Sequence, residues 1–186
     1  MGEAQKVLLF DRWSLGDVEV RDPGLKRYVS LRPACVPHSM GRHEHARFRK
    51  AEVNIVERLV NDLMRPGFSS GKKARALNVV RNAMEIIHLH TERNPVEIIV
   101  RAVENSAPCE DTTRISFGGM VIHMSIDVSP QRRVDVALRL LSEGARKAAF
   151  GNPRTLEECL AEELILAANG DVKSYAVQRR NEIERI

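Results

Sequence analysis

The chain has 186 residues, enough for one substantial hydrophobic core, and 29 Lys and Arg against 25 Asp and Glu give a pI near 9.2. Its three cysteines are far apart and odd in number, which excludes a disulfide framework and fits a reducing compartment. No apolar run reaches the roughly 20 residues that a membrane helix needs, and no signal-peptide pattern is present, so we expect a cytoplasmic protein without membrane contact.

Residues 1–50 are expected to form an N-terminal extension, and residues 51–186 a helical domain. Within the extension, residues 7–10 and 17–20 read as two short strands. The Asp22-Pro23-Gly24 turn and the Arg32-Pro33 pair interrupt any longer element. The fold of residues 1–35 is left open.

The densest positive segment is residues 35–50, where four cations stand against Glu44 alone: Arg42, Arg47, Arg49 and Lys50. A basic arm of this kind typically becomes ordered against RNA phosphates. The segment also holds four candidate zinc ligands, Cys35, His38, His43 and His45. Structural zinc sites usually show paired close ligands on both sides of a longer loop, so we predict no metal here and leave the role of the three histidines open.

Apolar residues at helical spacing predict a first helix over about 51–64, ended by Arg65-Pro66-Gly67, and a second over 71–91. Lys72, Lys73 and Arg75 lie at the start of the second helix. The free N–H groups of a helix start favour anions, so these cations could complete a phosphate-sized site, or they could simply be solvated. This is not a nucleotide-binding P-loop, because Ala74 stands where Ser or Thr would bind magnesium.

Asn94, Pro95 and Glu97 predict the cap, first residue and capping box of a third helix, which ends at Ala107-Pro108. Residues 112–127 then change to a period of two around Gly118-Gly119. This predicts a β-hairpin with three facing pairs: Phe117 with Met120, Ile115 with Ile122, and Thr113 with Met124. Its base should pack on the helices while its tip protrudes. Arg114 and His123 are the only basic groups on its arms.

Three further helices are predicted. The fourth starts with Ser129 as cap and runs to about Phe150, with Arg132 and Arg133 near one end and Arg146 and Lys147 near the other. The fifth, over 155–168, has a capping box and an acidic face that should meet solvent or a neighbouring protein. The sixth covers 172–186.

Four blocks resemble one known family in the same order: residues 69–84, 101–115, 127–150 and 158–170. The chain is similar to ribosomal protein seven of the small ribosomal subunit, and residues 37–53 resemble the archaeal and eukaryotic branch. The resemblance covers residues 51 to 186.

This resemblance implies a structural constituent of the small ribosomal subunit. Such a protein binds the 3′ major domain of the small-subunit ribosomal RNA, nucleates assembly of the head and contacts neighbouring ribosomal proteins. It also lies near the path of messenger RNA and exit-site transfer RNA, which the family's hairpin reaches. The alternative is a free-standing helical DNA- or RNA-binding protein, which for DNA should show a base-reading recognition helix.

The expectation is therefore a mainly α protein with six helices, one protruding hairpin and a basic N-terminal extension. No nucleophile with a base, and no paired carboxylates in an apolar setting, indicate an enzyme. Aromatic residues make up only 4% of the chain, so contact with RNA should be mostly cation to phosphate. No cofactor is predicted. The predicted RNA-binding residues are Arg42, Arg47, Arg49, Lys50, Lys72, Lys73, Arg75, Arg114, Arg132, Arg133, Arg146 and Lys147.

Overall fold

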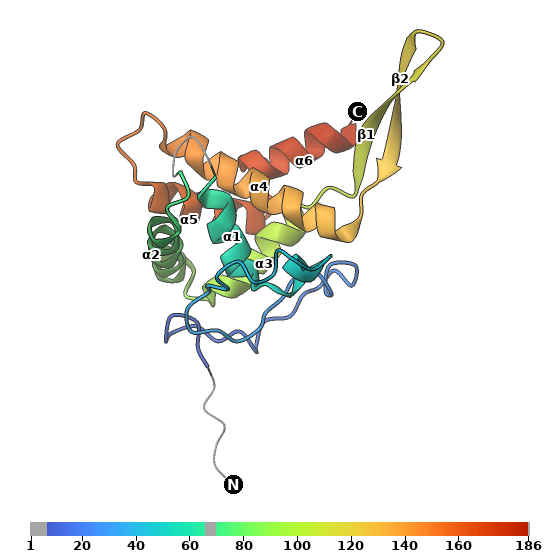
Figure 1. Cartoon of the computed structure of the whole chain (residues 1–186). Helices are drawn as coiled ribbons and strands as arrows, with labels where there is room; N and C mark the ends of the chain where they lie inside the picture. The colour runs from blue at the N-terminus through green and yellow to red at the C-terminus, as the bar shows by residue number, and fades with distance from the viewer. Residues whose placement is uncertain (1–6, 66–69, 186) are drawn as a thin grey trace.

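The structure is a computed structural model that describes residues 7–65 and 70–185. Within these residues the chain forms six α-helices, a short 3-10 helix and one antiparallel hairpin, which confirms the expected mainly α fold. The hairpin projects from one end of the helical body, and the N-terminal segment lies along another side (Figure 1). In chain order the elements are η1 Arg49–Glu52, α1 Ile55–Leu63, α2 Lys73–Thr91, α3 Pro95–Ser106, β1 Glu110–Phe117, β2 Met120–Asp127, α4 Pro130–Ala149, α5 Leu156–Ala168 and α6 Tyr175–Arg185.

Helix α1 is shorter than the sequence predicted, because it begins at Ile55 and not at residue 51. The Asn54 side chain accepts a hydrogen bond from the Val56 N–H at 2.9 Å and so caps the helix. Val53 is extended, which separates the 3-10 turn of η1 from α1. The predicted stop at Arg65-Pro66-Gly67 lies mostly outside the described residues.

The start of α3 follows the prediction in part. The Asn94 side chain accepts a hydrogen bond from the Val96 N–H at 3.1 Å, and Pro95 is the first helical residue. The Glu97 carboxylate, however, pairs with Arg101 one turn further on and does not return to the Asn94 N–H. The predicted capping box does not form at this helix, because the Asn94 side chain accepts from the second helical residue, Val96, and not from the third, Glu97. An i,i+4 arginine also competes for the Glu97 carboxylate.

Helix α5 packs against α2, α3 and α4 and places Leu160 and Leu164 in the core. Its capping box between Thr155 and Glu158 is confirmed. At the start of α4, by contrast, Ser129 occupies the cap position without a capping hydrogen bond from its side chain.

The expectation that the acidic face of α5 points outward is wrong for Glu163, which is buried. Its carboxylate accepts hydrogen bonds from the Ser174 hydroxyl at 2.7 Å and from the N–H groups of Ala176 at 3.0 Å and Tyr175 at 3.3 Å. The N–H groups at a helix start lack partners within the helix and attract negative charge. Glu163 therefore fixes the start of α6 against α5.

The N-terminal segment joins the same core as the helices. It contributes six buried apolar side chains: Leu9, Phe10, Leu15, Val18, Leu25 and Val29. The two short strands predicted at 7–10 and 17–20 do not form. Phe10 and Asp11 have positive φ and turn the chain back, which leaves a single bridge between Leu9 and Trp13. The division at residue 50 stays a prediction.

The hairpin has the predicted register, with Ile115 opposite Ile122 and Thr113 opposite Met124 around the Gly118-Gly119 turn. At its base, the Cys109 N–H donates to the Glu184 carboxylate of α6 at 3.0 Å. Beyond this base, one face is polar apart from Val121, and the other carries five exposed apolar side chains among those the structure describes: Ile115, Met120, Ile122, Met124 and Ile126.

Candidate nucleic-acid interface

Helix α1 carries two adjacent charged residues, Glu57 and Arg58, that are only 3% and 6% exposed. Burying a charge is costly unless it is paired and hydrogen-bonded. Each of these two residues is paired, and each reaches a different segment that carries predicted RNA-binding residues. The two buried charges therefore decide where those segments lie.

Glu57 connects α1 to α2 and to the basic arm, by which we mean residues 38–50. Its Oε1 accepts hydrogen bonds from Lys73 Nζ at 2.6 Å, from the Ser39 N–H at 2.7 Å and from the Ser39 hydroxyl at 2.8 Å. Lys73, a predicted RNA ligand, is thus held inside the protein with 17% of its side chain exposed. Lys73 and Ser39 of the arm share the same carboxylate oxygen of Glu57, so Lys73 helps to position the arm.

Arg58 connects α1 to α4 and to the segment that precedes the arm. Its guanidinium donates to Asp135 Oδ1 at 2.7 Å and to the Tyr28 carbonyl at 2.9 Å. The other oxygen of Asp135 pairs with Lys50. Lys50, another predicted RNA ligand, therefore fastens the end of the arm to α4.

These connections bring residues 26–32 and 46–52 together around an open groove of about 950 Å³, which we call the basic groove. Its cationic walls consist of Lys26, Arg27, Arg32, Arg47 and Arg49. Glu52 is its only acid among the described lining residues, and it is paired with Arg32 at 3.4 Å. Two aromatic residues, Tyr28 and Phe48, also line it.

Three of the groove cations, Lys26, Arg27 and Arg32, were not singled out from the sequence. The adjacent pair Lys26-Arg27 was a visible signal. It stands in a stretch with no regular period, however, and nothing local shows that it lies across from Arg47. That proximity depends on the hydrogen bond from Arg58 to the Tyr28 carbonyl, which is a contact across 30 positions in the sequence.

A second cationic site lies where α1 ends, α2 begins and α4 meets α5, and we call it the helix-end hollow. It has a volume of about 230 Å³, an apolar floor that includes Ala76 and Val79, and two arginines, Arg75 and Arg146. Arg146 Nε donates to the Ser142 carbonyl at 3.2 Å, which orients its guanidinium. Lys72, at the cap position of α2, is exposed three residues before Arg75.

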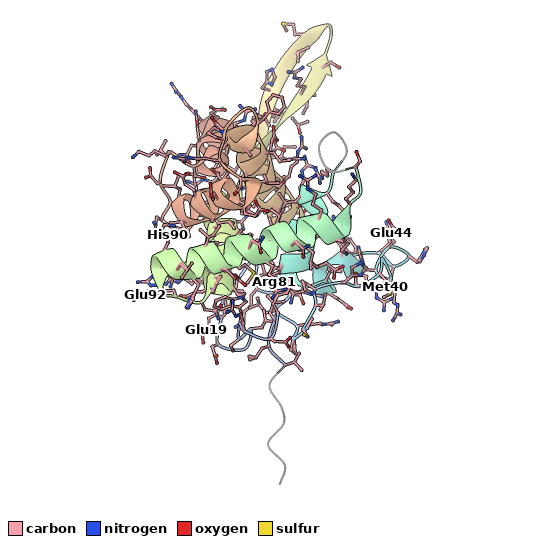
Figure 2. All side chains as sticks on the ribbon, turned by 90° about the vertical axis from the view of Figure 1, so that its left-hand side faces the viewer. Glu19, Met40, Glu44, Arg81, His90 and Glu92 are labelled. Carbon is pink, nitrogen blue, oxygen red and sulfur yellow. The ribbon has the colours of Figure 1, made fainter. Side chains whose placement is uncertain are left out.

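The basic arm extends beside the start of α2, as Figure 2 shows for Met40 and Glu44, while His90 and Glu92 mark the other end of that helix. Arg42 is exposed on this arm.

The remaining predicted residues are spread widely. Arg132 and Arg146 lie about 21 Å apart along α4, at 1.5 Å per residue. Arg132 is exposed beside Asp111 at 3.5 Å, and Arg114 is exposed on the polar face of the hairpin, opposite His123.

Two further predicted residues are engaged with partners within the chain. Arg133 has only 15% of its side chain exposed and pairs with Asp22 at 3.1 Å, which ties the N-terminal segment to α4. Lys147 donates to the Tyr175 hydroxyl at 2.7 Å, lies over that ring and pairs with Glu143 at 2.9 Å. The Tyr175 and Glu143 contacts raise the pKa of Lys147, so its charge is maintained.

Two histidines of the basic arm make contacts within it. The His43 ring contacts the Ser39 hydroxyl at 3.2 Å, and His38 Nδ1 accepts from the Met40 N–H at 3.1 Å. In the part of the chain that the structure describes, no group of three or more His, Cys, Asp or Glu side chains could hold a metal ion. On α2, His88 packs edge-on against Trp13 with ring centroids 4.8 Å apart.

The pairing of Glu57 predicts a pH dependence of stability. Burial favours its neutral form, but the hydrogen bonds from Lys73 and Ser39 outweigh burial and hold the pKa of Glu57 below its ordinary 4.5. A carboxyl with a lowered pKa in the folded state stabilises the fold above pH 4.5, and this contribution disappears as the pH falls through the folded pKa. Glu57→Gln should therefore be less stable than the unaltered chain at neutral pH, and the difference should shrink in acid.

The measurement is urea unfolding of both chains at a series of pH values. The informative quantity is the difference in unfolding free energy between the two chains, because Asp62 is present in both. Burial raises the pKa of Asp62, so its protonation favours the folded state of both chains in acid. A difference in unfolding free energy that stays constant across pH would contradict the assignment to Glu57.

No helix among residues 7–65 and 70–185 is both long and apolar enough to cross a membrane. The arrangement suits polyanion binding, because cations lie on several elements, with five of them lining the basic groove and two lining the helix-end hollow. Ion pairs of the buried residues Glu57 and Arg58 fix the scaffold that carries them.

Comparisons with a protein family and with individual proteins point to the same family. Residues 25–186 match the family described as ribosomal protein S7p/S5e. Three archaeal proteins, each named small ribosomal subunit protein uS7, are similar over nearly their whole lengths. The one from Cenarchaeum symbiosum is 54% identical, covering 100% of this chain and 98% of the relative. Those from Methanothermobacter thermautotrophicus and Methanosphaera stadtmanae are 50% and 48% identical, each covering 96% of this chain and 96% and 95% of the relative.

Proposed function

The chain belongs to the ribosomal protein S7p/S5e family, and we propose that it binds the 3′ major domain of the small-subunit ribosomal RNA and helps to nucleate the head of the subunit. As a member of this family it is a structural, non-enzymatic component of the small ribosomal subunit, of the archaeal and eukaryotic type that the sequence resemblance indicated. We further propose that it works in the cytoplasm, next to neighbouring ribosomal proteins and near messenger and exit-site transfer RNA.

The observation that best supports RNA binding is the distribution of exposed cations over separate elements. A reader of DNA sequence would concentrate base-reading side chains on one helix in the major groove. Here the cations line the basic groove, the helix-end hollow and the first turn of α4. Such a spread suits a folded RNA, which is recognised largely by its shape and its phosphates.

The proposed phosphate contacts are the exposed members of the predicted set, together with the groove cations found in the structure. Lys73 and Arg133 have partners within the protein, so we propose that they position the interface. The exposed candidates are Lys26, Arg27, Arg42, Arg47, Arg49, Lys50, Lys72, Arg75, Arg114, Arg132 and Lys147, and the half-buried Arg146 joins them as a lining residue of the helix-end hollow.

Changing Lys72 and Arg75 together to Gln tests the contact at the start of α2. Both side chains are exposed, and Gln retains helix propensity, so the fold should be unchanged. Each lost phosphate contact should reduce the slope of log affinity against log salt by about 0.7 to 0.9, and hence by about 1.4 to 1.8 for the pair. The measurement is filter binding to the 3′ major domain at several salt concentrations.

Arg81→Gln is the matched control, because Arg81 is an exposed arginine midway along the same helix (Figure 2). It should leave affinity and slope nearly unchanged. If the double variant binds like this control, the cations at the start of α2 are solvated, and the basic groove would have to carry the interface. If the unaltered chain shows no preference for the 3′ major domain over unrelated RNA, the proposed function fails.

A further inference from the structure

We propose that the basic groove binds an unpaired segment of RNA, with one base stacked on the ring of Phe48. This inference rests on the proposed RNA-binding function and deepens it, because it states which form of RNA this site takes. It also adds a base-stacking contact to the expectation that contact with RNA is mostly cation to phosphate.

The first support is the combination of charge and aromatic surface. Four groove cations, Lys26, Arg27, Arg47 and Arg49, have no ion pair within the described residues, while the groove's one acid is already held by Arg32. Sites for single-stranded nucleic acid combine a positively charged groove with aromatic side chains on which bases stack. Both parts are present here, although they come from segments that are about 20 positions apart in the sequence.

The second support is the conformation and exposure of Phe48. Its φ of +59° lies in the left-handed region, which a bulky residue adopts only at a cost. Its side chain is 71% exposed, so burial in the protein core does not offset that cost. The backbone is nevertheless held, since the Phe48 carbonyl accepts from the Ala51 N–H at 3.0 Å. A ring displayed in this way, between Arg47 and Arg49, is placed to meet a flat partner while the arginines meet its phosphates.

The third support is that contacts within the chain hold both walls of the groove. Arg58 holds the Tyr28 carbonyl on one wall, and Lys50 fastens the segment after Phe48 to Asp135 of α4. Fixed walls reduce the ordering cost of binding. The groove's volume lies near the upper end of the about 300 to 1,000 Å³ found for sites of drug-sized ligands, so it can take more than a single base.

Double-stranded RNA does not fit this chemistry. Its bases are stacked within the helix, and its deep major groove is too narrow for side chains to read. A duplex would therefore contact the arginines and leave Phe48 without a partner. A change of the side chain at residue 48 should therefore alter the affinity for single-stranded RNA and leave the affinity for duplex RNA unchanged.

The experiment is fluorescence anisotropy of the full chain with a labelled ten-nucleotide RNA, either single or annealed to its complement. Phe48→Ala should weaken binding of the single strand by about 5- to 150-fold, the range for loss of one stacked base, and leave the duplex unaffected. Phe48→Trp should bind the single strand as tightly as the unaltered chain does. The fluorescence of the new indole should also be quenched when the single strand binds, and the signal is simple to assign because Trp13 is the only other tryptophan. Leu89→Ala, which removes an exposed apolar side chain from α2, is the control and should behave like the unaltered chain.

Equal binding of the single strand by the unaltered chain and Phe48→Ala would overturn the inference, as would equal losses for single strand and duplex. If Phe48→Ala proves misfolded by circular dichroism, Phe48→Trp decides alone: absence of quenching by the single strand overturns the proposal. Binding of the 3′ major domain is measured in parallel. If the unaltered chain does not bind this domain, the proposed function is rejected. If it binds the domain but changes at residue 48 do not alter binding of the single strand, only the stacking site is rejected.

Discussion

Replacing Arg58 by Met should lower the free energy of unfolding by about 1.5 to 3 kcal/mol, the range for a lost hydrogen bond to a charged group, because Arg58 is buried while its partner Asp135 is 35% exposed. Methionine retains much of the buried apolar volume, so the loss reports the missing guanidinium. Without it the Tyr28 carbonyl loses its donor, and Asp135 keeps only Lys50. Urea unfolding should show a lower midpoint with an unchanged slope.

Arg101→Met provides the comparison. Arg101 forms an ion pair with Glu97 one turn away on α3 and is more exposed than Arg58. Pairs of this kind contribute about 0.3 to 0.5 kcal/mol. Equal losses for the two variants would mean that Arg58 does not hold the N-terminal segment in place. The Arg58 variant should also bind single-stranded RNA more weakly, because one wall of the basic groove depends on it.

The second large effect is expected at Gly144, where α4 packs against the first residue of α6. A Cβ atom added there would lie 2.9 Å from the Tyr175 Cβ and 3.1 Å from the Glu163 carboxylate. Overpacking of this kind costs about 1 to 3 kcal/mol. The cost rises further if the displaced carboxylate loses the N–H groups at the start of α6, since an unsatisfied buried group costs about 1 to 3 kcal/mol. Gly144→Val should therefore destabilise the chain and detach α6.

Hydrogen exchange identifies where that loss occurs. Amides of α6 should exchange much faster in Gly144→Val, while those in the middle of α4 keep most of their protection. Gly16→Ala is the control, because no atom lies within 4 Å of a Cβ at that position and its φ is not positive. If α6 retained its protection in the valine variant, the close approach at Gly144 would be unimportant for docking this helix.

The sequence predicted the elements whose signals are local. Gly118-Gly119 and the alternating residues around it specify the hairpin register, and Thr155 with Glu158 specifies a helix start, because each depends on residues within a few positions. The start of α1 was missed because the helical rhythm continues through residues 51–54, and only the Asn54 cap shows where hydrogen bonding begins.

The site was harder to predict, because its geometry depends on contacts across long sequence separations. Glu57 and Arg58 look like ordinary surface charges of an amphipathic helix, and nothing nearby shows that their partners are Lys73 and Asp135. The same is true of Glu163, whose carboxylate serves a helix that starts twelve positions later. Positive charge could be counted from the sequence, but which cations are exposed and which are held inside depends on the fold.

The hairpin has a consequence for the chain before it is assembled. In a two-stranded sheet both strands are edges, and here neither strand contains proline and one face carries five exposed apolar side chains among those described. Exposed edges and apolar faces promote pairing between chains, and natural proteins usually block them with charge or a cover. Free copies should therefore aggregate in a concentration-dependent way unless a partner covers the hairpin, which light scattering of the purified chain at increasing concentration would detect.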